Sequence, residues 1–166
     1  EILPKVASIY AAREILLSEL QKQRIAITDK RQSKAQELTQ KLNNHIRLHV
    51  SPRTSKTLFR ASLELVGKRS GIRTVEYDSI AEKCHPIPFV KELIGEDYDN
   101  LATQTDIDRS RLEKLRDFII EHKLIDELYD LQLTDVDDEI DVMLQVETGT
   151  YKRIEDLAHG QKCMVV

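Results

Sequence analysis

The stretch EIDVMLQVETGTYKRIEDL, residues 139–157, decides how the C-terminal part of this chain folds. Apolar and polar residues alternate over 140–146, which is the period of a β-strand with one buried face. The Thr-Gly pair at 148–149 indicates a turn. Tyr151 and Ile154 then open a short returning segment. We therefore predict a β-hairpin in this part of the chain.

The hairpin leads directly into LAHGQK, residues 157–162. A turn of small residues at the start of a helix presents free backbone N–H groups and the positive end of the helix dipole, which together attract an anion. Gly160 permits close approach of the backbone, and Gln161 can add a side-chain amide. The segment is therefore a candidate anion site, and the apolar residues 163–166 are interpreted as the first turn of the helix behind it.

The N-terminal part of the chain has the pattern of one long helix. Helix-forming residues dominate it, and neither Gly nor Pro occurs between Pro4 and Pro52. Apolar residues follow a 3-4 spacing with one phase shift, at Val6, Ile9, Leu16, Leu20 and Ile27, then at Ala35, Leu38, Leu42 and Ile46. The narrow stripe favours pairing with a single partner helix. We expect residues 1–45 to form a coiled-coil arm helix, with an amphipathic helix of a bundle as the alternative.

The middle of the chain mixes short strands and helices. Alternating apolar residues predict a short strand over 45–52, and a capped helix follows over 54–67. Residues 72–77 are a candidate second strand. A helical insert is expected over about 79–135, and within it helical spacing predicts one continuous helix over 108–131.

Composition limits the class of protein. The chain is 33% charged and 40% hydrophobic, and it has no apolar run long enough to cross a membrane, so no membrane partner is expected. Residues 1–80 carry a net charge of +7 and residues 81–166 carry −11. A basic first half is compatible with contact to phosphate backbones, although uneven solvated faces of one protein explain it equally well. Cys84 and Cys163 show no pairing pattern, which indicates free thiols in a reducing cytoplasm.

Two motif-like stretches do not predict sites. GKRS at 67–70 lacks the upstream glycine and the Ser or Thr of a phosphate-binding loop, and Gly67 is interpreted as a helix-ending residue. LTDVDDEID at 133–141 lacks the glycine and spacing of an EF-hand and is interpreted as a solvated acidic turn. We therefore expect neither a metal site nor a catalytic residue in this chain.

The segment YKRIEDLAHGQK, residues 151–162, resembles the signature motif of ABC-type ATPases, which reads Leu-Ser-Gly-Gly-Gln followed by Lys or Arg. In particular it resembles the coiled-coil ATPases of the SMC and RecN kind, and the bacterial AAA-like ATPases of the TrlF kind. In those proteins the C-terminal half of the head directly follows the returning coiled-coil helix. Long helix, short strand, helical insert, hairpin and signature are expected in the same order here.

The resemblance implies that the signature of one head contacts the γ-phosphate of ATP held by a second head. The residues that would make this contact are Ala158, His159, Gly160, Gln161 and Lys162. Leu157 takes the leading Leu position and is expected to pack inward. Ala158 lacks the hydroxyl that the family's Ser offers, so either backbone N–H groups or His159 contact the phosphate, or the site is degenerate.

The fold implied is α+β and predominantly helical: a long coiled-coil helix over 1–45, followed by a small mixed lobe over 46–166 that is part of an ABC-type ATPase head. The intact cytoplasmic protein would be an ATPase that uses ATP and Mg²⁺, with Mg²⁺ held outside this segment. The segment alone would be inactive, because it lacks the phosphate-binding loop and the catalytic Glu. The resemblance implies three partners: the rest of its own head, a second head in a homodimer, and DNA. It also implies a role in DNA repair or in defence against phage and other foreign DNA.

A different class of function is also compatible with the residues. A coiled-coil protein-interaction module with a small α+β domain needs no nucleotide. A hydrolase whose catalytic residues are scattered along the chain is a third alternative, because such residues cannot be identified from spacing alone.

Overall fold

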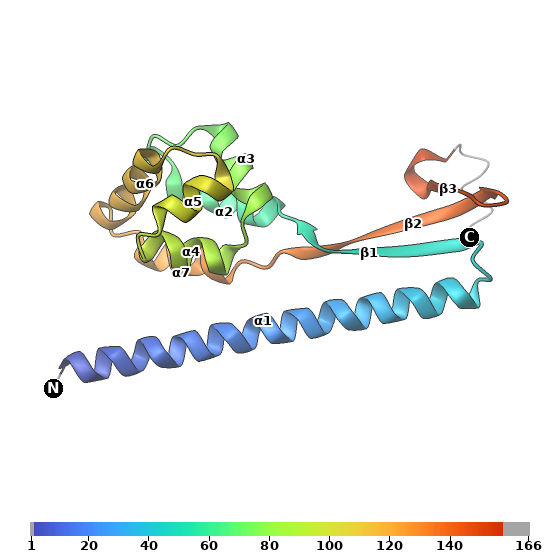
Figure 1. Ribbon diagram of the computed structural model, residues 1–166, viewed down its shortest axis with the longest axis horizontal. Helices are drawn as coiled ribbons and strands as arrows, with labels where there is room; N and C mark the ends of the chain where they lie inside the picture. The colour runs from blue at the N-terminus through green and yellow to red at the C-terminus, as the bar shows by residue number, and fades with distance from the viewer. Residues whose placement is uncertain (1, 158–166) are drawn as a thin grey trace. The chain divides into compact units, whose positions relative to one another are not determined.

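The computed structural model describes residues 2–157 of the chain. The elements follow in the order helix α1, strand β1, helices α2 to α7, strands β2 and β3, and the short 3-10 helix η1 (Figure 1). The chain divides into two compact units, of which the first is Glu1–Pro52 with Asp138–Val166 and the second is Arg53–Asp137. The helical unit is therefore inserted into the sequence of the unit that carries the sheet. It begins well before residue 79, where the sequence placed the start of the insert.

Helix α1 spans Ile2–Lys41 and confirms the predicted long helix. It ends before residue 45 because Asn43 and Asn44 adopt left-handed backbone angles, with φ of 50° and 59°. Asn tolerates this conformation better than other non-glycine residues. The N–H of Asn44 donates to the carbonyl of Thr39 at 3.0 Å and so closes the last turn. Within residues 2–157 no helix combines the length and the apolar character that spanning a membrane requires.

Two neighbouring faces of α1 have different environments. On one face, Thr39 Oγ1 accepts a hydrogen bond from the Leu48 N–H at 3.0 Å, and Ala35 is buried. Ala35 was expected in the coiled-coil seam, but its burial removes it from any surface that a partner helix could reach. Of the other residues expected in the seam, Leu20 and Ile46 are half-buried. The rest are exposed, namely Val6, Ile9, Leu16, Ile27, Leu38 and Leu42. Pairing of this stripe with a partner helix stays a prediction.

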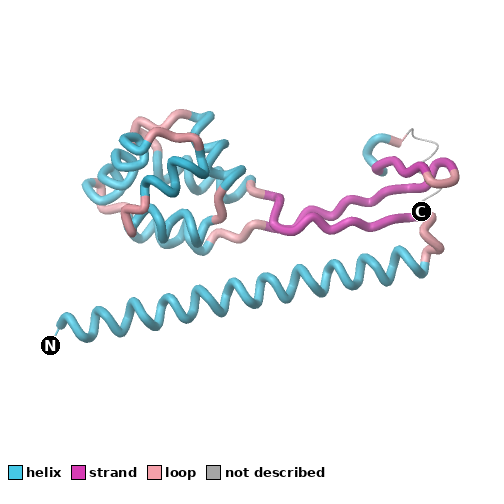
Figure 2. The backbone as a smooth tube through the Cα atoms, viewed as in Figure 1, coloured by secondary structure: helices cyan, strands magenta, loops and turns pink. Residues whose placement is uncertain are grey.

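The sheet has three strands in the order β1-β2-β3 (Figure 2). Strand β1 spans Ile46–Ser55, β2 spans Asp137–Glu147 and β3 spans Thr150–Arg153. The antiparallel pair β2–β3 is the predicted hairpin, which is confirmed. Strand β1 continues past Pro52, where the sequence analysis ended it. Proline is tolerated there because β1 lies at an edge of the sheet, where a strand has an unpaired side.

The helical unit contains short helices that form one bundle (Figure 1). Their bounds are α2 Thr57–Gly67, α3 Thr74–Lys83, α4 Pro86–Ile94, α5 Tyr98–Thr105, α6 Arg109–Glu121 and α7 Ile125–Leu133. Proline at the first position of α4 suits a helix start, because the missing N–H would have no partner there. Asp108 caps α6 by accepting the Ser110 N–H at 2.8 Å.

This unit has a hydrophobic core of its own. Phe59 and Phe89 meet edge to face with ring centroids 6.1 Å apart. Other fully buried side chains of the core are Leu63, Ile80, Leu93, Leu101, Leu112, Leu115, Ile119, Leu128 and Leu131. All core members fall between Phe59 and Val136, so the core lies entirely within Arg53–Asp137.

Two expectations for the middle of the chain were wrong, and one helix was not predicted. Residues 72–77 do not form a strand, because α3 begins at Thr74 and buries Tyr77 and Ile80 with helical spacing. The single helix predicted over 108–131 is two helices, since Lys123 adopts a left-handed φ of 57° and separates α6 from α7. Helix α5 was not foreseen, because its short sequence has only two buried apolar residues.

Gly67 ends α2, as predicted, and lies against the ring of Tyr77. The Tyr77 hydroxyl donates to the Gly67 carbonyl at 2.6 Å. A Cβ atom on Gly67 would lie 2.7 Å from Tyr77 Oη and 2.9 Å from its Cε1. This approach is too close for any side chain, so the position requires glycine for packing.

We expect Gly67→Ala to lower the free energy of unfolding by about 1–3 kcal/mol, which is the usual cost of overpacking. The measurement is urea denaturation followed by circular dichroism. The control is a double-mutant cycle with Tyr77→Ala, which removes the clashing ring. In that background Gly67→Ala should be neutral or stabilising, because alanine loses less backbone entropy. Equal destabilisation in both backgrounds would contradict the packing explanation.

Candidate functional site

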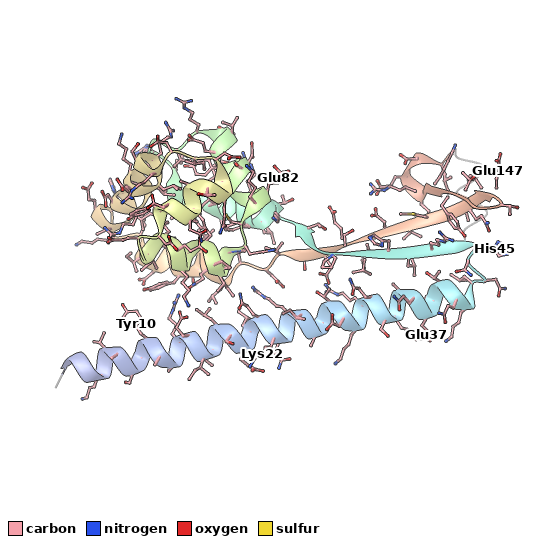
Figure 3. All side chains as sticks on the ribbon, viewed as in Figure 1. Tyr10, Lys22, Glu37, His45, Glu82 and Glu147 are labelled. Carbon is pink, nitrogen blue, oxygen red and sulfur yellow. The ribbon has the colours of Figure 1, made fainter. Side chains whose placement is uncertain are left out.

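The hairpin β2–β3 fixes the backbone that leads into the candidate anion segment. The paired residues are Met143 with Arg153, Leu144 with Lys152, and Gln145 with Tyr151. The register then shifts between Gln145 and Glu147, and Glu147 pairs with Thr150. Gly149 closes the turn with a φ of 84°, a conformation that favours glycine. Glu147 and His45 lie at the same end of the sheet (Figure 3).

Side chains from different strands secure β3. The Arg47 guanidinium on β1 lies 3.7 Å from the centre of the Tyr151 ring, a cation–π contact that contributes roughly 0.5–2 kcal/mol. The Tyr151 hydroxyl donates to the Asn44 carbonyl at 2.8 Å, in the turn between α1 and β1. The Gln145 N–H donates to the His45 carbonyl at 2.8 Å. The start of β1 and the end of the hairpin are therefore tied together.

The end of the described chain is anchored by Leu157. Helix η1, Ile154–Asp156, follows β3 directly. The Leu157 N–H donates to the Ile154 carbonyl at 3.2 Å, and the Leu157 side chain is only 5% exposed. The expectation that Leu157 packs inward is confirmed. Ala158, His159, Gly160, Gln161 and Lys162 lie outside the described residues.

A small cleft lies beside this anchor. Its lining is Ile140, Asp141, Val142, Arg153, Ile154 and Glu155. Its volume is about 150 Å³, below the roughly 300–1,000 Å³ of ligand pockets. Arg153 pairs with Asp141 at 3.2 Å across it. The cleft is too small for a nucleotide, so the described hairpin cannot enclose ATP by itself.

The same unit has a second, polar cleft between α1 and the sheet. Its volume is about 360 Å³, and its lining is Gln36, Thr39, Gln40, Asn44, Arg47, Leu48, His49 and Met143. Arg47 is its permanently charged side chain and already lies over the Tyr151 ring. Amide and hydroxyl groups form most of the remaining lining, so the cleft offers little charge to attract a nucleotide.

A larger cleft lies in the helical unit between α2 and α3. Its volume is about 470 Å³, and its lining is Thr54, Lys56, Thr57, Arg60, Asp78, Ala81 and Glu82. Lys56 donates to the Glu82 carbonyl, and burial lowers the pKa of its ammonium group. Arg60 pairs with Asp78 at 2.5 Å and with Glu64 at 2.6 Å. The chain's own oxygens therefore already satisfy both cations, which weakens any attraction for an anion.

The carboxylate of Asp138 on β2 binds residues of α1, a contact that the sequence does not predict. The carboxylate accepts the Thr28 hydroxyl at 2.9 Å and pairs with Arg31 at 2.9 Å, and the side chain is only 2% exposed. Residues 133–141 were interpreted as a solvated acidic turn, which is wrong for this carboxylate. Thr28 and Asp138 are 110 positions apart, so no local pattern could have identified the contact.

We expect Asp138→Asn to destabilise the attachment of α1 to the sheet by about 1–3 kcal/mol, because Thr28 and Arg31 then face a neutral amide in place of the buried carboxylate. Amide hydrogen exchange over residues 28–41 should become faster. Asp137→Asn removes the same charge from an exposed neighbouring position and should leave exchange unchanged. Equal protection in wild type and Asp138→Asn would show that the carboxylate does not hold the helix.

The described residues contain no group of three or more His, Cys, Asp or Glu side chains that could hold a metal ion. Cys84 is buried in the helical unit, and burial raises the pKa of its thiol to about 11. It is therefore protonated at neutral pH and a poor metal ligand or nucleophile. The chain matches no protein-family model, no curated protein and no solved structure.

Proposed function

We propose that this chain is part of an SMC-like ABC-type ATPase and contributes the signature motif that contacts ATP bound by a partner head. One observation carries the proposal: hairpin β2–β3, helix η1 and the buried Leu157 directly precede residues 158–162 in the sequence. A signature loop needs such a rigid base, because it must present its backbone at a fixed position.

The roles of the individual residues follow from their chemistry. Gly160 lets the backbone approach the γ-phosphate closely, and its neighbouring N–H groups donate to the phosphate oxygens. Gln161 adds a side-chain amide, and Lys162 adds a positive charge. Ala158 offers no hydroxyl, so His159 or the backbone supplies the remaining donor. ATP supplies the phosphoryl group, and the rest of the head and its partner hold ATP and Mg²⁺.

The exposed stripe of α1 supports the arm in this proposal. Its large apolar residues are exposed with a helical repeat, from Ile9 at 66% and Leu16 at 70% to Leu42 at 41%. A single helix gains stability by burying such a stripe against a second helix. In the proposed protein the second arm helix covers it, and ATP binding and hydrolysis join and release two heads that act on DNA, in repair or in defence against foreign DNA.

The complete reading frame of the gene tests the proposal. It should encode a Gly-x-x-x-x-Gly-Lys-Ser/Thr loop upstream of α1 and an apolar strand ending in Asp-Glu downstream of residue 166. The purified intact protein should then associate in the presence of ATP and Mg²⁺, as measured by light scattering. A reading frame without either motif would rule the proposal out.

The helical unit favours a second candidate, a protein-interaction module without a nucleotide role. Its core is complete within Arg53–Asp137, as expected of an independent binding domain. This candidate needs no ATP. Association of the intact protein that is the same with and without ATP, together with a reading frame lacking both motifs, would favour it.

A further inference from the structure

The loop between α2 and α3 concentrates positive charge. Residues 68–73 include Lys68, Arg69 and Arg73, and all three are exposed. In the part of the chain that the structure describes, none of the three forms an ion pair with a carboxylate. By contrast, the exposed Arg109 of the same unit pairs with Glu113 at 2.7 Å. These three charges are therefore available to a partner.

The loop is held in one conformation by the helices beneath it. The Ser70 N–H donates to the Gly67 carbonyl at 2.9 Å, and Ile72 packs against the core. Arg111 on α6 donates to the Gly71 carbonyl. Because the loop is already ordered, a partner that binds it loses little conformational entropy on binding.

Helix α6 adds one more exposed cation, Lys114, next to the loop. Leu115 Cδ1 lies 3.2 Å from the position of a Cβ atom on Gly67, which places α6 directly at the start of the loop. Arg111 pairs with Glu76 at 2.7 Å, so the carboxylate that touches the loop is already neutralised. Lys114 is exposed and lies on the same side of α6 as Arg111. Asp108 interacts electrostatically with both Arg111 and Lys114.

The positive charge near the loop between α2 and α3 is local, because the helical unit as a whole is acidic. Residues 53–137 together carry a net charge of −5. The four cations of the loop and α6 that no carboxylate pairs with among the described residues are Lys68, Arg69, Arg73 and Lys114, here called the cationic loop surface. A patch of this kind on an acidic unit attracts an anionic partner at one place only.

We propose that the cationic loop surface binds the phosphate backbone of duplex DNA. Lys and Arg side chains on a rigid loop neutralise phosphates without reading bases. The surface has no exposed aromatic side chain, which single-strand binding by base stacking would use. Protein interfaces are depleted in Lys and rely on aromatic anchors, so an acidic protein fits less well. The choice of DNA rests on the proposed function, whereas the binding surface itself does not involve ATP.

The test measures fluorescence anisotropy of a labelled duplex with the full chain and no nucleotide, at ~50 mM and ~200 mM salt. The triple variant Lys68→Glu, Arg69→Glu and Arg73→Glu should bind at least about tenfold more weakly. The slope of log affinity against log salt should also decrease by about 0.9 for each phosphate that the variant no longer neutralises. The matched control reverses three exposed charges on α1, as Lys5→Glu, Lys22→Glu and Lys30→Glu, and should retain wild-type affinity.

Each other outcome overturns the proposal. An equal loss of affinity in both triple variants would mean that net charge, and not this surface, governs binding. No binding by the wild-type chain, or tighter binding of polyglutamate than of duplex, would exclude DNA as the partner.

The neutral triple variant with Gln at the same positions should also bind duplex DNA more weakly. Its thermal unfolding midpoint should equal that of the wild type, which separates an effect on binding from an effect on folding. The DNA-binding assay contains no nucleotide. A failure to bind duplex DNA would therefore leave the ATPase proposal standing, and a failure to hydrolyse ATP would leave the DNA-binding result standing.

Discussion

Gly160→Asp is expected to reduce ATP hydrolysis by the intact protein at least about a hundredfold, the scale reported for disrupting one stabilising contact to a reacting oxyanion. The new carboxylate would place a negative charge and a side chain where the γ-phosphate of the partner's ATP approaches. Nucleotide binding by the isolated protomer should remain, because that site lies on a different part of the head. The measurements are steady-state hydrolysis and equilibrium nucleotide binding.

Thr148→Asp is the matched control for this variant. It adds the same carboxylate in the exposed turn between β2 and β3, a few residues before Leu157. The control should hydrolyse ATP at the wild-type rate. Wild-type hydrolysis by Gly160→Asp would count decisively against the signature assignment.

Leu112→Ala is expected to cost the helical unit about 3–5 kcal/mol, the range for a fully buried leucine that leaves a cavity. Leu112 is 0% exposed and lies on α6 within the core. Since small domains have only about 5–15 kcal/mol of stability, the variant should unfold at much lower urea concentration or be unfolded at room temperature. Urea denaturation followed by circular dichroism measures the effect.

Leu65→Ala provides the comparison on the same unit. Leu65 lies on α2 and is 75% exposed, so its truncation should change the free energy of unfolding by less than about 0.5 kcal/mol. A small effect of Leu112→Ala, or equal effects of the two variants, would contradict the core described for this unit.

The elements that could be predicted well are those with long local periodicity. Helix α1 and the hairpin β2–β3 each repeat one pattern over many residues, so their type could be predicted. The first turn of α3, residues 74–77, was mistaken for part of a strand, because Ile72 and Val75 are β-branched residues and the tertiary packing of Tyr77 and Ile80 favours a helix. A brief helix was expected only over 79–83. The break between α6 and α7 depends on the left-handed backbone of Lys123, which no propensity indicates.

The contacts around the candidate site were less predictable than the elements. Arg47 with Tyr151, and Thr28 with Asp138, join residues more than a hundred positions apart, so they arise only when the chain folds. Residues 67–70 lack the pattern of a phosphate-binding loop, so their sequence alone predicts no binding site. The role proposed for their charges depends on α6, because Arg111 donates to the Gly71 carbonyl and Lys114 lies on the same side of this helix.

The most direct measurement uses ATP with a photoreactive aryl azide on its γ-phosphate, bound to the intact protein and irradiated. The proposed contact predicts that the label is attached to the tryptic peptide Ile154–Lys162 of the protomer opposite the bound nucleotide. Mixed dimers with one protomer unable to bind nucleotide identify that protomer, and Gly160→Asp should abolish the labelling. Nucleotide bound in full with no label on this peptide would contradict the claim that these residues face the γ-phosphate.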